Sequence, residues 1–293
     1  MAYVNAMEKA LIYIENHLND DIDLSIIAKE AGYSLYHFHR IFKGVVGDSI
    51  KEYIRKRRIT EAAKELVSSN KPTIDIAIKY GYQSREAFSR AFEKVYGRNP
   101  LEVKHEGLFY HIREPMTFDY MMFEYNRQKY GMQPVLQKLP EFLVVGKKYD
   151  IQVDKSSYQE IPLLWQQWNN SREWTYIEER KYDDKCMGIC IFEEGDTFQY
   201  MVGHEVTSVN NIPKDMTAHR IKPSLYAVFK TIGPLTESVQ KTIDYIYTVW
   251  LSESEYEHAG LNDIEYYYYS QGELVADIYI PILPSNKSRH HNI

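Results

Sequence analysis

A ten-residue pattern that occurs twice constrains the fold of this chain more than any other feature. The segments FHRIFKGVVG (Phe38 to Gly47) and FSRAFEKVYG (Phe88 to Gly97) both fit F-x-R-x-F-x-x-x-x-G and lie fifty positions apart. The two phenylalanines of each pattern are four residues apart, so on a helix they share one face and we expect them in the core. The arginine between them, Arg40 or Arg90, points away from that face.

The repeat extends upstream, where small and aromatic residues recur at an offset of 49. The matched pairs are Ala28 and Ala77, Gly32 and Gly81, and Tyr33 and Tyr82. Each copy is a short apolar-periodic segment, a turn that contains Gly, and a second amphipathic segment. Ser34 and Ser84 stand where N-caps of the second helices belong. This order predicts two helix-turn-helix units.

A long helix is predicted between the two units. The run from Ser49 to Ser69 contains no Pro or Gly and keeps helical apolar spacing, so it would extend about 30 Å at 1.5 Å per residue. Two reading helices so joined could reach major-groove segments about 34 Å apart. Within this helix the basic run Arg55 to Arg58 points in four directions, and we expect some of its members to pair with Glu52 and Glu61.

The pattern by itself leaves a purely structural helical bundle open, but a family resemblance favours DNA binding. Residues of about 5–104 resemble the DNA-binding domain of the AraC/XylS family of bacterial transcription regulators. The family signature is seen in GYQSREAFSRAFEKVYGRNPLEV, from Gly81 to Val103, and the first copy and the linker match as well. One departure is Asn99, where Ser or Thr usually precedes the Pro.

The resemblance implies DNA-contacting roles for the second helix of each unit. The implied residues are Tyr36, His39 and Arg40 in the first unit, and Arg85, Glu86, Ser89 and Arg90 in the second. Arg can bind guanine O6 and N7 with two hydrogen bonds, and Glu can accept one from cytosine N4. For Arg85 and Glu86 an ordinary solvated helix face remains the alternative.

The rest of the chain differs from the first part in charge and aromatic content. Residues 1–105 carry 17 Lys/Arg and 14 Asp/Glu, a charge of +3, whereas the remainder carries 18 and 27, a charge of −9. All four Trp and eighteen of 26 Tyr lie after residue 105. We therefore predict a mildly basic domain followed by an acidic, aromatic-rich domain.

A second repeat, one of pattern only, is predicted in this acidic half. A strand, a helix and two strands recur in the same order, with a Trp late on each helix. The segments are 140–153, 158–173, 185–194 and 197–206, then 216–233, 236–254, 263–269 and 273–283. This duplicated β-α-β-β pattern predicts an α+β domain in which the helices cover one face of a sheet.

The predicted organisation has four parts. They are an all-α domain over 1–105, a linker over 106–136, an α+β domain over 137–284, and a disordered tail over 285–293. The linker is too apolar for a disordered segment, so we expect it to pack on one of the domains.

The second domain resembles the GyrI-like, or AraC effector-binding, domain. The resemblance covers about residues 137–284 and is carried by LPEFLVVG, IPLLWQQW, FQYMVGHEV, IKPSLYAVFKTIGP, TVWLSESEYE, DIEYYYY and DIYIPI. It implies that a small, often lipophilic or cationic, effector binds in a cleft between the two halves of the domain. It also places a strand acid resembling Glu265 in that pocket.

Strand alternation gives Glu265 a plausible chemistry. In DIEYYYY, Glu265, Tyr267 and Tyr269 share one face. A carboxylate among aromatic rings would hold a cation through charge and ring faces, whereas an edge-strand acid in water is the alternative. The candidate effector residues are Glu265, Tyr267, Trp165, Trp168, Tyr226 and Trp250. For the last four, packing in the core is the alternative.

Three classes of function fit these features. The first is a transcription regulator that binds double-stranded DNA and senses a small molecule. The second is a small-molecule hydrolase with Glu265 as general base beside a tyrosine. The third is an architectural DNA binder whose second half contacts proteins such as RNA polymerase.

The remaining expectations concern cofactors and compartment. The sequence shows no Ser/His/Asp or metal constellation, so we predict no catalytic residues, no metal and no cofactor. Cys186 and Cys190 are interpreted as small core residues of a cytoplasmic protein. No apolar run approaches the roughly 20 residues that a membrane helix needs, and we expect no membrane association.

Overall fold

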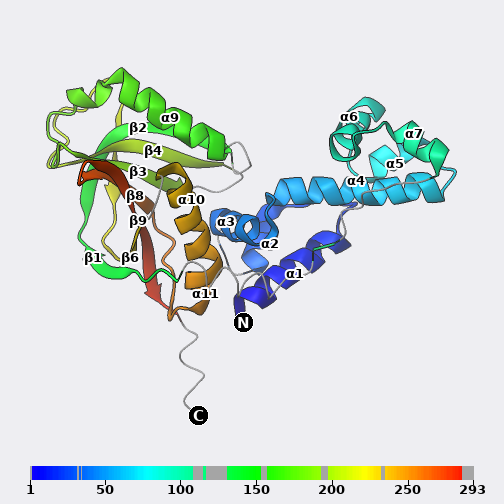
Figure 1. Cartoon of the computed structure of the whole chain (residues 1–293), viewed down its shortest axis with the longest axis horizontal. Helices are drawn as coiled ribbons and strands as arrows, with labels where there is room; N and C mark the ends of the chain where they lie inside the picture. The colour runs from blue at the N-terminus through cyan, green and yellow to red at the C-terminus, as the bar shows by residue number, and fades with distance from the viewer. Residues whose placement is uncertain are drawn as a thin grey trace, which may run out of the picture. The chain divides into compact units, whose positions relative to one another are not determined.

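The chain folds into two compact units in a computed structural model (Figure 1). The first unit comprises Met1–Tyr33 and Val46–Phe118, and the second comprises Ser34–Val45 and Asp119–Ile293. The structure describes residues 2–31, 33, 35–107, 115–116, 131–152, 157–192, 197–231 and 235–285. Gly32, Ser34, most of the predicted linker and the tail beyond residue 285 lie outside these ranges.

The described part of the first unit is helical, as predicted. Its helices are α1 (Ala2–Asn16), α2 (Leu24–Glu30), α4 (Ile50–Ser68), α5 (Thr73–Lys79), α6 (Arg85–Tyr96) and α7 (Pro100–Glu106). Helix α3 (Leu35–Val46), the second helix of the first repeat, groups with the second unit except for its last residue.

Local capping explains where these helices begin and end. The Ser49 hydroxyl accepts a hydrogen bond from the Glu52 backbone N–H at the start of α4, and Ser84 caps α6 in the same way. The N-cap predicted at Ser84 is thus confirmed. Helix α6 ends at Tyr96 and is capped by Gly97, whose φ of 69° is readily adopted by glycine. Asn99 then forms a capping box with α7.

The basic run on α4 connects this helix to α1 and to the segment that follows α1. Arg57, whose side chain is 3% exposed, forms ion pairs with Glu15 of α1 and with Glu61. Arg58 donates to the backbone carbonyls of Leu18 and Asp20. Arg55 forms an ion pair with Glu52, so pairing of the run with Glu52 and Glu61 is confirmed.

The second unit is built on a single antiparallel sheet. Within the described residues the sheet has nine strands in the order β1-β6-β9-β8-β3-β4-β2-β5, and β7 pairs with β9. The strands are β1 (Val135–Leu139), β2 (Phe142–Gln152), β3 (Lys185–Phe192), β4 (Thr197–Val206), β5 (Thr217–Ile221), β6 (Ser224–Lys230), β7 (Tyr256–His258), β8 (Asp263–Ser270) and β9 (Glu273–Pro284). Its helical segments are α9 (Ser157–Ser171), η1 (Glu173–Tyr176), α10 (Leu235–Tyr245), the π-helical turn η2 (Ile246–Trp250) and α11 (Leu251–Glu253).

The duplicated β-α-β-β pattern is confirmed as β2-α9-β3-β4 and β6-α10-β8-β9. One expected strand differs, because the segment 216–233 is divided into β5 and β6 at Lys222 and Pro223. Pro has no backbone N–H and interrupts a hydrogen-bonded ladder. Strand β5 pairs with β2, whereas β6 pairs with β1 and β9.

The sheet carries a different core on each face. On the face covered by α9, Trp165 and Trp168 pack with Cys190 and Tyr200. On the opposite face a second cluster contains Ile264 and is flanked by Tyr266. Because side chains alternate along a strand, β8 directs Glu265 and Tyr267 to the helix-covered face and Tyr266 and Tyr268 to the other.

Candidate functional site

Helix α6 presents four of the predicted DNA-contacting residues on its solvent side. Phe88 and Phe92 are fully buried on the inner side of the helix. Arg85, Glu86 and Arg90 are exposed, and Ser89 is half-buried. The four residues follow the spacing i, i+1, i+4 and i+5, which places them on one helical face. Such a face can enter a major groove N-terminus first.

The corresponding helix of the first repeat has a different environment. His39 is 4% exposed and Arg40 is half-buried in α3. The side chain of Tyr36 lies outside the described residues. The two repeats are therefore similar in sequence but differ in how far their predicted reading residues are exposed.

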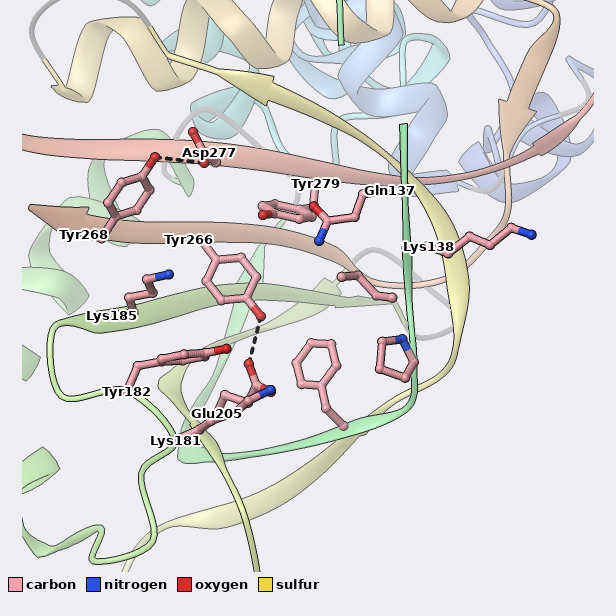
Figure 2. Close-up of a pocket in the computed structure, with 13 residues that line it drawn as sticks. Gln137, Lys138, Lys181, Tyr182, Lys185, Glu205, Tyr266, Tyr268, Asp277 and Tyr279 are labelled. Carbon is pink, nitrogen blue, oxygen red and sulfur yellow. Dashed lines mark hydrogen bonds and ion pairs between the residues drawn. The ribbon is translucent and has the colours of Figure 1, made fainter. Parts of the chain in front are cut away.

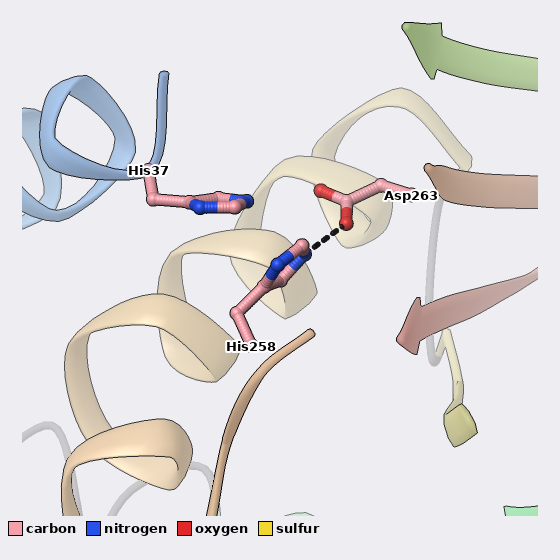
Figure 3. A group of neighbouring side chains, drawn as sticks. All are labelled: His37, His258 and Asp263. Carbon is pink, nitrogen blue, oxygen red and sulfur yellow. Dashed lines mark hydrogen bonds and ion pairs between the residues drawn. The ribbon is translucent and has the colours of Figure 1, made fainter. Parts of the chain in front are cut away.

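His37 of α3 belongs to a cluster of potential metal ligands with His258 and Asp263 (Figure 3). The Gly260 backbone N–H donates to Nδ1 of His258 (2.9 Å). That bond assigns the ring proton to Nε2, which donates to Oδ1 of Asp263 (2.8 Å). A metal ion at Nε2 would have to displace this proton and its hydrogen bond to Asp263, and the His258–Asp263 contact is accounted for by that hydrogen bond.

Glu265 lies at the centre of a hydrogen-bonded aromatic network on the helix-covered face. Its side chain is in β8, and the residue is 6% exposed. The hydroxyls of Tyr200 (2.6 Å) and Tyr267 (2.9 Å) both donate to Oε2. Trp165 of α9 donates from Nε1 to the Tyr200 hydroxyl (2.9 Å), and its ring lies 4.5 Å from that of Tyr267.

The electrostatics of this network keep the tyrosines protonated. Burial raises the pKa of Tyr200 and of Tyr267 well above the usual value, and the neighbouring charge of Glu265 raises them further. Both hydroxyls therefore act as donors at neutral pH. They stabilise the carboxylate by hydrogen bonds that carry no positive charge.

Gly188 makes the network possible. It lies directly opposite Glu265 in the pairing of β3 with β8. A Cβ at this position would lie 2.0 Å from the Tyr200 hydroxyl and 2.9 Å from Oε2 of Glu265. Only a residue without a side chain allows Tyr200 to reach the carboxylate.

Comparisons with known proteins match both parts of the chain. A helix-turn-helix domain family matches residues 27–106. The family described as integron-associated effector binding protein matches residues 136–282, which is just over half of the chain. The chain is a member of the AraC family of transcription regulators and carries a GyrI-like effector-binding domain.

Curated relatives agree with this assignment. The regulator is 42% identical over 94 residues to the HTH-type transcriptional activator AarP of Providencia stuartii, covering 32% of this chain and 70% of AarP. It is 32% identical over 105 residues to the regulatory protein SoxS of Escherichia coli, covering 36% of this chain and 98% of SoxS. These relatives are transcriptional regulators, and no family of enzymes is indicated.

Solved structures similar to this regulator include SAV2435 bound to tetraphenylphosphonium. That structure is 20% identical and covers 55% of this chain and 98% of its own, with a TM-score of 0.47. The integron cassette protein VCH_CASS2 of Vibrio cholerae is 15% identical and covers 52% of this chain and 97% of its own, with a TM-score of 0.40. Among the described residues, no helix is long and apolar enough to cross a membrane.

The structure brings together three of the six predicted effector residues of this regulator, namely Glu265, Tyr267 and Trp165. Trp168 is buried in the core beneath α9. Tyr226 lies on the opposite face of the sheet, and Trp250 packs edge-on against Phe229 of β6.

Sequence reasoning missed Tyr200 and Gly188. A glycine within an apolar strand signals close approach of another group, and that signal was present in KCMGICIF. The identity of the approaching group, Tyr200, depends on strand pairing.

Proposed function

We propose that this regulator reads operator DNA through the outer face of α6 together with the half-buried Arg40 of α3, and that it senses a small lipophilic cation at Glu265. The DNA-contacting and effector-binding roles of the individual residues are part of this proposal. The observation that supports the sensing role most strongly is that only one of the two Glu265 carboxylate oxygens accepts side-chain hydrogen bonds from the described residues.

Both tyrosine hydroxyls donate to Oε2 of Glu265. Among the described residues, no side chain donates to Oε1, and no Lys or Arg forms an ion pair with this carboxylate. A buried carboxylate without a cationic partner is costly, because neutral donors replace only part of its hydration. A cationic ligand at Oε1 would supply the missing charge.

The surrounding rings suit the same ligand. The rings of Trp165, Tyr200 and Tyr267 lie in the same network as the carboxylate, and aromatic ring faces attract cations and apolar groups alike. Because Glu265 is 6% exposed, a ligand reaches it when Trp165 or helix α9 moves. Pro162 lies inside α9 and removes one backbone hydrogen bond from that helix, which lowers the cost of such a movement.

A calorimetric titration of the full chain tests the sensor. Tetraphenylphosphonium and tetraphenylborate have the same shape and opposite charge, so they separate charge from apolar burial. We expect the cation to bind and Glu265→Gln to weaken it at least tenfold, while tetraphenylborate is bound weakly by both proteins. Equal affinity of the wild type and Glu265→Gln for the cation would exclude Glu265 as its receptor.

Selection of bound sequences from random DNA tests the proposed DNA-binding role of α6. We expect a preferred site that the wild type binds more tightly than random DNA, and a smaller preference in Arg90→Ala. Binding of random and selected DNA with one affinity would contradict sequence-specific reading.

A further inference from the structure

The sheet has a cavity on the face opposite Glu265. The cavity measures about 450 Å³ (Figure 2). It is lined by residues of β1, β2, β3, β4, β8 and β9, by Pro140 between β1 and β2, and by Lys181 and Tyr182 before β3. Tyr266 and Tyr268 line it, whereas their strand neighbours Glu265 and Tyr267 face the helices. Volumes of about 300–1,000 Å³ are usual for small-molecule sites.

The most buried acid of the cavity is already neutralised. Glu205 is 8% exposed. It accepts a hydrogen bond from Lys181 through Oε1 (2.6 Å) and another from the Tyr266 hydroxyl through Oε2 (3.2 Å). With a cation and a hydroxyl on its two oxygens, Glu205 has little remaining attraction for a cationic ligand.

Lys185 is positioned differently. Its ammonium lies 4.7 Å from the ring centroid of Tyr182 and 5.7 Å from that of Tyr268. Within the described part of the chain, no carboxylate forms an ion pair with it. Ring faces hold an ammonium in place without cancelling its charge, so Lys185 can still bind an anion.

The second acid of the cavity lies beside Tyr268. The Tyr268 hydroxyl donates to Oδ2 of Asp277 (2.9 Å). Burial, together with this bond, raises the pKa of Tyr268 to about 12, so the hydroxyl remains a donor at neutral pH. With three lysines and two acids, the lining has a formal charge of +1.

Aromatic rings form the wall between these charged groups. The rings of Tyr266 and Tyr279 lie 4.9 Å apart and are tilted by 56°, which leaves ring faces and edges available to a planar ligand. Figure 2 shows Lys138 pointing away from the other side chains of the cavity.

We propose that this cavity is a second ligand site, which binds an aromatic carboxylate with its ring against Tyr266 and Tyr279 and its carboxylate on Lys185. The site is separate from the proposed sensor: it lies on the other face of the sheet and takes the opposite charge. The chain would then respond to two chemically different small molecules.

Calorimetry of the full chain with 2-naphthoate tests this proposal, and 2-naphthylmethylammonium is the probe of opposite charge. We expect saturable binding of naphthoate, with at least a tenfold loss in Lys185→Gln and recovery to within about threefold in Lys185→Arg. Lys222→Gln, which removes the same charge from an exposed side chain that does not line the cavity, should change the affinity less than twofold.

Glu265→Gln separates this site from the proposed sensor, since it should leave naphthoate binding unchanged even where it abolishes binding of tetraphenylphosphonium. Three results would each overturn the proposal. These are no saturable binding of naphthoate by the wild type, equal binding by a folded Lys185→Gln protein, and loss of naphthoate binding in Glu265→Gln.

Discussion

Gly188 and Glu265 face each other across β3 and β8, and the missing side chain of the glycine is the space through which Tyr200 reaches the carboxylate. A Cβ at Gly188 would lie 2.0 Å from the Tyr200 hydroxyl. The hydrogen bond of 2.6 Å between Tyr200 and Glu265 therefore depends on a residue that itself forms no side-chain contact.

The substitution Gly188→Ala should displace Tyr200 and leave Glu265 with one donor fewer. Loss of a hydrogen bond to a buried group costs about 1–3 kcal/mol, so we expect a loss of that size in the free energy of unfolding measured in urea. Binding of tetraphenylphosphonium should fall with it. Cys186→Ala, a small change two residues away on the same strand, is the control, and wild-type ligand affinity in Gly188→Ala would contradict the network.

Arg90→Ala should weaken binding to the selected DNA site by about 1–3 kcal/mol and relax the preference at one or two base pairs, as expected for an arginine that contacts a base. Lys64→Ala removes the same charge from α4, where Lys64 pairs with Glu61, and should lower affinity for all DNA equally or not at all. An unchanged ratio of specific to random binding in Arg90→Ala, measured by fluorescence anisotropy, would show that Arg90 is not a reader.

Arg57→Met should loosen the attachment of α1 to α4. The change leaves Glu15 without its main cationic partner, and breaking a buried ion pair costs about 3–5 kcal/mol. Because the side chains of Glu15 and Glu61 are 20% and 28% exposed, we expect the free energy of unfolding to fall by about 2–3 kcal/mol. Hydrogen exchange of the α1 amides should accelerate accordingly. Lys64→Met, which removes an exposed partner of Glu61, should have little effect, and equal exchange rates in Arg57→Met would refute the assignment.

His204 should make the second unit sensitive to acid. Burial lowers the pKa of His204 to about 4, below the usual value of about 6.5. As the pH falls, the unfolded chain binds this proton first, so stability is lost below about pH 6.5. At 1.36 kcal/mol per pKa unit, the loss between pH 7.5 and pH 4.5 is about 2–3 kcal/mol. Urea unfolding of His204→Phe should show a pH dependence smaller by that amount, and an unchanged dependence would contradict it.

Sequence patterns predicted the helices, an N-cap and the faces of the strands, because interactions between residues close in the sequence determine these features. The repeated F-x-R-x-F segments required amphipathic helices, and Ser84 marked the start of α6 by its capping chemistry. Strand alternation placed Glu265 and Tyr267 on one face before any pairing was known. The same reasoning also predicted that the basic run would pair with Glu52 and Glu61.

Features that depend on strand register were not accessible from the sequence. Gly188 and Tyr200 lie beside Glu265 because β3 pairs with both β4 and β8. Strands β3 and β8 are widely separated along the chain, so this pairing cannot be predicted from local patterns. Tyr226, like Tyr267, is a tyrosine in a predicted strand, but its strand directs it to the sheet face opposite Glu265. The environment of His39 likewise follows from tertiary packing of α3, which helical periodicity does not specify.

The most direct test of the account measures DNA affinity as a function of the proposed effector. Two ligands that bind one protein are coupled by a free energy of typically 1–3 kcal/mol when the protein is allosteric. We predict that saturating tetraphenylphosphonium changes the dissociation constant of the wild-type regulator for its selected site at least fivefold. Glu265→Gln should bind the same DNA with the same affinity whether or not the cation is present. An identical affinity of the wild type for DNA with and without bound cation would contradict the claim that this chain is a ligand-responsive regulator.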